Sequence, residues 1–128
     1  MDVLQFQDWL ETRGYSLPVY LLMFPNDPDN VVAFQVAEGV GSKGPVTNYT
    51  VNFFIRATHP STALQVGTDI IKDLDNRTRV FLGETQLILM QALTSVPVPI
   101  GTDENKRHIF NVQIKVLLSP TDKLNTKE

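Results

Sequence analysis

The most regular pattern in the chain is an alternation of side chains over residues 48–55. One face of this segment carries Tyr49, Val51, Phe53 and Ile55, and the other carries Asn48, Thr50, Asn52 and Phe54. Residues 109–118 alternate in the same way, with one face formed by Phe110, Val112, Ile114, Val116 and Leu118. A period of two is that of a half-buried strand. Both segments are therefore predicted as strands with one face in the core.

Two other segments follow the helical period. In residues 2–13, Asp2 is the expected N-cap with Gln5 at capping-box spacing, and Gly14 is the expected stop. Its apolar stripe is Val3, Phe6 and Leu10, widened by Leu4 and Trp9. A second helix is predicted from Pro60 to Leu74, with an apolar stripe that includes Ala63, Gly67, Ile70, Ile71 and Leu74. Gly67 is expected to allow close packing on the sheet.

The remaining segments complete an α+β order. Residues 19–24 and 31–37 are predicted to form a hairpin around the turn cluster 26–30, and residues 86–96 form a further strand. We treat residues 76–83, Pro97 to Pro99 and the turn 101–106 as connections. The expected fold is helix, three strands, helix, two strands: an antiparallel sheet of about five strands, with a mixed sheet as the alternative, and both helices on one face. Residues 1–120 are expected to form one domain, and 121–128 a polar, disordered tail.

Composition excludes several classes of function. The 128 residues hold 11 Lys and Arg against 14 Asp and Glu, for a net charge of −3, so nothing favours sequence-independent nucleic-acid binding. There is no cysteine, which excludes thiol catalysis, cysteine-ligated zinc and disulfides. The start Met1–Asp2 has no basic region of the kind that opens a signal peptide, so none is expected.

Charge is unevenly distributed along the chain. Three stretches carry none: Gly14 to Asn26, Gly44 to Ile55 and Thr85 to Thr102. The last is interrupted by glutamines, hydroxyl residues and prolines, so it is not predicted to span a membrane. Strands whose outer faces are polar but neutral are typical of surfaces that meet protein.

No motif predicts catalysis, a cofactor or a metal. Residues 39–46 match the glycine pattern of phosphate-binding loops, but Pro45 leads into a strand where a dinucleotide site needs a helix. The acidic groups are interpreted as solvated turns and helix faces: Asp27, Asp29, Asp69, Asp73, Asp75, Asp103 and Glu104. His59 and His108 are not predicted to be catalytic, because the sequence contains no Gly-x-Ser-x-Gly motif with a serine nucleophile.

The layout resembles the tail-terminator or minor capsid proteins of long-tailed bacteriophages over residues 1–118. Three features carry the resemblance: the strand ending Asn52-Phe53-Phe54-Ile55-Arg56-Ala57, the Ala63 to Leu74 helix directly after it, and the segment from Ser95 to Asn111. The resemblance implies a non-enzymatic virion protein, assembled in the bacterial cytoplasm. It implies a hexameric ring on the head-proximal end of the tail tube that stops tube polymerisation and docks the head connector. DNA would pass through its lumen without specific binding.

Neutral strand faces and loops on a rigid sheet are the expected contact surfaces. The interface is predicted to include Gly39, Gly41, Lys43, Gly44, Asn48, Thr50, Asn52, Asp103, Glu104, Lys106 and Arg107. Two alternatives stay open. One is a head-closure or connector protein of the same particle. The other is a small ligand-binding or hydrolytic domain with a pocket where Asp73, Asp75 or His59 converge.

Overall fold

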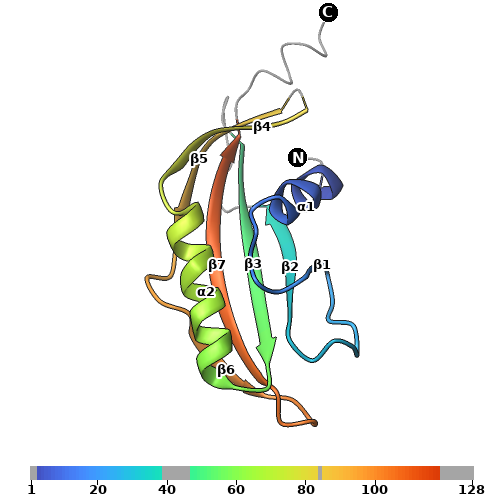
Figure 1. Cartoon of the computed structure of the whole chain (residues 1–128). Coiled ribbons are helices and arrows are strands. Elements are labelled where there is room, and N and C mark those ends of the chain that lie inside the picture. Colours follow the sequence, from blue (N-terminus) through green and yellow to red (C-terminus); the bar gives the residue numbers. More distant parts are fainter. Residues whose placement is uncertain (1–2, 39–46, 84, 119–128) are drawn as a thin grey trace, which may run out of the picture.

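Two helices lie on one face of a curved, mixed sheet in the computed structural model (Figure 1). The structure describes residues 3–38, 47–83 and 85–118. The elements in chain order are α1 (Val3–Glu11), β1 (Val19–Leu21), β2 (Val31–Glu38), β3 (Thr47–Ala57), α2 (Pro60–Leu74), β4 (Arg77–Leu82), β5 (Thr85–Ala92), β6 (Val98–Thr102) and β7 (His108–Leu118). The predicted α+β class with both helices on one face is confirmed.

The sheet is built around the pair β3 and β7. These strands run antiparallel from the pair Thr47 and Leu118 to the pair Ala57 and His108. The strand order is β1-β2-β3-β7-β5-β4, and β6 pairs with the half of β7 that β5 leaves free. Both strands were predicted from their alternation, and Val51, Phe53, Val112 and Ile114 are indeed fully buried.

The first helix closes one side of the core with an aromatic contact. Phe6 is fully buried and meets Phe34 of β2 edge to face, with ring centroids 5.7 Å apart. Phe34 in turn lies 6.1 Å from Phe53 of β3. The helix ends before Gly14, whose φ of +77° suits a residue without Cβ, as predicted. The predicted N-cap Asp2 lies outside the described residues.

The second helix packs closely on the sheet through Gly67. A Cβ at this position would lie 2.6 Å from Cγ of Pro97 and 3.4 Å from a methyl carbon of Val112 in β7. Pro97 is itself buried, in the connection between β5 and β6. Close packing at Gly67 was therefore predicted correctly, and it locks that connection against the helix.

The predicted hairpin of residues 19–24 and 31–37 is wrong. β1 has only three residues and runs parallel to β2, with Val19 opposite Val32 and Leu21 opposite Phe34. Directly after β1, Leu22 adopts a φ of +79° while its N–H still donates to the carbonyl of Phe34. The chain then needs residues 22–30 to return to the start of β2. The turn residues at 26–30 were interpreted as the tight turn of a hairpin. They form part of a longer loop, residues 22–30, that returns the chain to the start of β2.

The sheet also has seven strands where about five were expected. The supposed link 76–83 contains β4, which pairs with β5, and a left-handed Arg79 (φ +59°) interrupts its alternation. The supposed connection around Pro99 contains β6, whose five residues are all exposed. The strand predicted for 86–96 ends at Ala92. These strands escape pattern analysis because a backbone irregularity or a sheet edge removes the apolar alternation.

We expect Gly67→Val to destabilise the fold. Two methyl groups in the space occupied by the Pro97 ring overpack the helix–sheet contact, which typically costs about 1–3 kcal/mol. Leu64→Val on the exposed side of the same helix is the control, with an expected change within about 0.5 kcal/mol. Urea unfolding followed by the fluorescence of Trp9 measures both. Equal stability of the two variants would contradict the close packing.

Candidate subunit interface and its anchoring network

The sheet face turned away from the helices carries the neutral side chains predicted for an interface. Asn48, Thr50 and Asn52 of β3 lie on this face and are partly exposed. Nε2 of Gln113 in β7 donates to Oδ1 of Asn52 at 2.8 Å. Lys115, opposite Thr50, adds one positive charge. This face is therefore a largely neutral, amide-rich surface.

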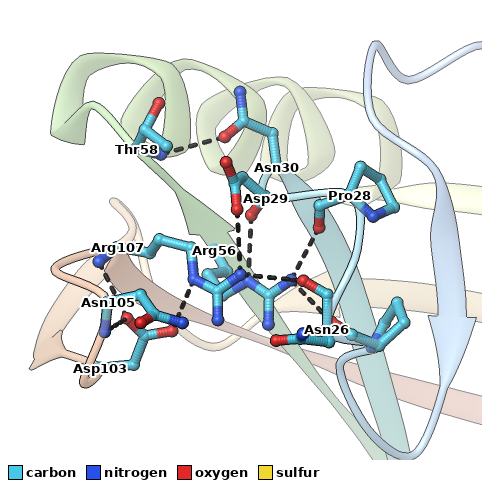
Figure 2. A network of polar contacts seen from close by, with 10 residues as sticks. Asn26, Pro28, Asp29, Asn30, Arg56, Thr58, Asp103, Asn105 and Arg107 are labelled. Carbon is cyan, nitrogen blue, oxygen red and sulfur yellow. Dashed lines mark hydrogen bonds and ion pairs between the residues drawn. The ribbon is translucent and has the colours of Figure 1, made fainter.

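One end of the same face is covered by the return loop 22–30. Arg56 of β3 is 3% exposed because this loop lies over it. Nε of Arg56 donates to the carbonyl of Asp29 at 3.0 Å, and Nη2 donates to the carbonyls of Pro25 and Pro28 at 2.7 Å each (Figure 2). The ring of Phe24 lies 4.8 Å from Cζ of the guanidinium. The side chain of Arg56 thus donates hydrogen bonds to several backbone carbonyls of this loop.

Arg107 ties the turn between β6 and β7 to the same loop. Its Nη1 donates to the carbonyl of Asn26 at 3.0 Å and to Oδ1 of Asp29 at 3.1 Å, and its Nε donates to Oδ2 of Asp103 at 2.8 Å (Figure 2). Asp103 also accepts the backbone N–H groups of Asn105 and Arg107. Lys106 completes the turn in a left-handed conformation with φ +62°.

The network changes the pKa of Arg56 and of Asp103. Burial, followed by the neighbouring charge of Arg107, lowers the pKa of Arg56. The backbone N–H of Arg107, outweighing the effect of burial, lowers the pKa of Asp103. Arg56 remains charged, since an arginine pKa starts far above neutrality. The network therefore holds loop and turn together as one rigid unit at this end of the sheet.

The structure separates the predicted interface residues into three groups. Asn48, Thr50 and Asn52 lie together on the helix-free face, as expected from their alternation. In the β6–β7 turn, Glu104 and Lys106 are exposed, whereas Arg107 is 6% exposed and bonded within the chain. Arg107 therefore positions the turn. The predicted loop residues lie outside the described residues: Gly39, Gly41, Lys43 and Gly44.

A second network joins the two helices to β4. Asp73 near the end of α2 accepts two bonds from Arg13, at 3.0 and 2.8 Å, one from Tyr15 at 2.7 Å and one from Arg77 at 2.8 Å. Both arginines also lie over the ring of Trp9, at 5.1 and 5.8 Å from its centroid. Sequence analysis treated Asp73 as a solvated residue, and this was wrong. Arg13 and Tyr15 are about 60 residues away and leave no local pattern, whereas Arg77 is four residues away.

This clustering changes the acidity of the groups involved. Burial alone would raise the pKa of Asp73, but the hydrogen bonds of Arg13 and Tyr15 and the nearby positive charges lower it to about 2. Burial, and then the bond to Asp73, raise the pKa of Tyr15. Asp73 is thus a fixed negative charge that holds α1, α2 and β4 together.

The residues proposed for an alternative pocket do not converge. His59 precedes α2 while Asp73 lies near its other end, about 20 Å away for a helix of this length. Asp75 accepts the backbone N–H of Ala92 and so connects α2 to β5. A cavity of about 380 Å³ lies elsewhere, lined by Leu10, Glu11 and residues 15–20. None of the three candidate residues lines it.

Comparison with known proteins identifies the family. The family model of the bacteriophage tail terminator protein matches residues 3–120. The chain belongs to this tail terminator family. It is therefore a structural protein of the phage tail and a component of the virion. The resemblance noted from its strands and second helix is confirmed.

Solved structures share the fold of this chain at low sequence identity. One, from the virion of a native gene transfer agent particle, matches with a TM-score of 0.61 and 12% identity over 91% of this chain and 94% of the other. A second has a TM-score of 0.53 and 14% identity over 90% and 88%. No curated protein matches the sequence. Across residues 3–38, 47–83 and 85–118, no helix is long and apolar enough to cross a membrane.

We expect Arg56→Met to destabilise the protein by about 3–5 kcal/mol, because it leaves buried carbonyls of the return loop without a donor. Arg56→Lys should recover little, since one ammonium cannot reproduce the fork of the guanidinium. Arg79→Met, at an exposed arginine of β4, is the matched control, with a change within about 0.5 kcal/mol. Urea unfolding provides the comparison. Wild-type stability in Arg56→Met would show that the loop is held by other contacts.

Stability should fall in acid through Asp73. Its pKa is lowered in the folded protein from the usual 3.8 to about 2, so its contribution is complete above about pH 4 and is lost as the pH falls towards 2. The loss amounts to about 2 kcal/mol. Asp73→Asn should be less stable at pH 6 and show a shallower acid decline, whereas Asp69→Asn on the same helix should follow the wild type. Parallel declines of all three proteins in pH-dependent urea unfolding would contradict the assignment.

Proposed function

We propose that this protein closes into a hexameric ring on the head-proximal end of the tail tube, stops tube polymerisation and provides the surface on which the head connector docks. The family match over residues 3–120 is the observation that carries the proposal. A structural neighbour from a gene transfer agent virion is consistent with it. The neutral amide face of β3 and β7 adds a physical reason, because charged residues are depleted where subunits meet.

A ring of this chain would carry a large negative charge. Six copies at −3 each give −18. With acidic groups lining the lumen, the walls would repel DNA, which would then pass through without sticking. The partners in this proposal are further copies of the chain, the tail tube protein and the head connector, and DNA is cargo without a specific site.

The test is native mass spectrometry of the purified chain over a concentration series, alone and with purified tail tubes, followed by imaging of the dominant species. The expected result is a closed ring, formed in solution or on the tube end, with an acidic lumen. Tubes capped by the protein should stop growing when tube subunits are added. Binding to portal complexes in place of tube ends would favour a head-closure role. A chain that stays monomeric under every condition would contradict the proposal.

A further inference from the structure

Two of the three charge-free stretches each contain a strand at an edge of the sheet: β1 lies at one edge, and β6 lies at the opposite edge, of which β4 forms the other part. Gly14 to Asn26 contains β1, and Thr85 to Thr102 contains β5 and β6. The sheet order places β1 at one edge and β6 on the far side of β7 (Figure 1). Stretches separated by about 60 residues of sequence therefore expose neutral surface on opposite sides of one molecule.

The two edges also lie at the same height of the sheet. Strand pairing gives a continuous row that runs from Tyr20 in β1 through Ala33, Phe54 and Asn111 to Val98 in β6. A neighbouring row runs through Gln35, Asn52 and Gln113, with Leu22 bonded to Gln35 at one end and Leu93 bonded to Gln113 at the other. Four strand spacings of about 4.8 Å separate β1 from β6, or about 19 Å.

Each edge exposes large apolar side chains at this height. We call Leu22 and Met23 the first edge cluster, and Leu93, Val96, Val98 and Ile100 the second edge cluster. All six side chains are between 41% and 71% exposed. Exposed apolar groups in a neutral surround are a mark of a protein contact. Two such clusters on opposite sides suit a head-to-tail contact, in which each copy offers a different surface to each neighbour.

The backbone of both edges is poorly suited to extending the sheet. β1 has three residues, which limits the number of hydrogen bonds it could make. β6 contains Pro99, which has no N–H to donate, and its pairing with β7 shifts register between Pro99 and Gly101. Contact between the edges must therefore come from apolar side chains, which leaves the six residues of the two clusters as its main source of binding energy.

We propose that the first edge cluster of one copy of this chain packs against the second edge cluster of the next copy, and that this head-to-tail contact builds the ring. The inference rests on the proposed function for the ring itself and adds which surfaces meet. It does not use the predicted loop at residues 39–46 or the turn at Asp103.

The test places one charge in each cluster: Met23→Glu in the first and Val96→Glu in the second. An unpaired charge buried in the contact should raise the concentration for half-assembly at least about tenfold in each variant. Leu4→Glu is the matched control, because Leu4 is 63% exposed on α1 and belongs to neither cluster. It should assemble as the wild type does. Unchanged urea unfolding of all three variants verifies that the subunit stays folded.

Mixing the two variants tests whether the contact is head-to-tail. Met23→Glu retains an intact second cluster, and Val96→Glu retains an intact first cluster, so the mixture can form one head-to-tail contact and no ring. Native mass spectrometry should show dimers containing one copy of each variant. Homodimers formed as readily as these heterodimers would overturn the head-to-tail assignment.

The outcomes separate this inference from the proposed function. Rings that form equally well in Met23→Glu and Val96→Glu would overturn the edge assignment and leave the ring intact. Wild-type rings that respond to these variants but never bind tube ends would support the edges and contradict the terminator role. A wild-type chain that stays monomeric with and without tubes would overturn both.

Discussion

The arrangement of this protein depends on a guanidinium buried in its central strand. Arg56 lies on the helix-free face of β3, and its donors take the carbonyls of residues 25, 28 and 29. Buried carbonyls without a donor are costly, so the return loop between β1 and β2 is held where this side chain can reach it. Because the loop must come back to Arg56, the chain leaves β1 at Leu22 and re-enters the sheet parallel to its previous direction. The loop that begins with the exposed Leu22 and Met23 is thus anchored by a cation two strands away from β1.

Most of the arginines are used inside the subunit. Of five arginines, Arg13 and Arg77 bind Asp73, while Arg56 and Arg107 hold the loop and turn at the opposite end of the sheet. These two networks fix the connections on either side of the core and place no charge on β1 or β6, while Arg77 and Arg79 lie on the outer strand β4. β1 and β6 are neutral because neither strand contains a charged residue.

Sequence patterns predicted the parts of the fold in which burial alone sets the pattern. β3, β7 and α2 each have one face in the core, so the spacing of their apolar residues indicates whether they are strands or helices. The close packing at Gly67 was predicted because this residue lies on the apolar stripe of α2. β4 and β6 could not be found in this way. Arg79 breaks the alternation of β4, and β6 is an edge strand without a buried face.

The roles of the side chains that anchor the fold were not predicted from the sequence, for a different reason. Arg107 was predicted as an exposed contact and Asp73 as a solvated acid, since the residues next to them in sequence are polar. Each has one partner four residues away and others about 60 to 80 residues away, and only the folded topology brings the distant partners together. By contrast, Asn48, Thr50 and Asn52, which were predicted as interface residues, were placed on one face correctly, because alternation within a single strand decides their orientation.

The edges combine apolar side chains with a backbone that resists sheet extension, and this combination constrains how copies can associate. An edge with free N–H and C=O groups accepts any strand of similar length, which leads to open-ended aggregation. At β6, Pro99 and the register shift remove regular donors, and at β1 only three residues are available. In the head-to-tail contact that we propose, association must match the shape of specific side chains: Leu22 and Met23 on one copy and the second edge cluster on the next. A contact of that kind fixes the rotation between neighbours, and a fixed rotation is the condition for a ring to close.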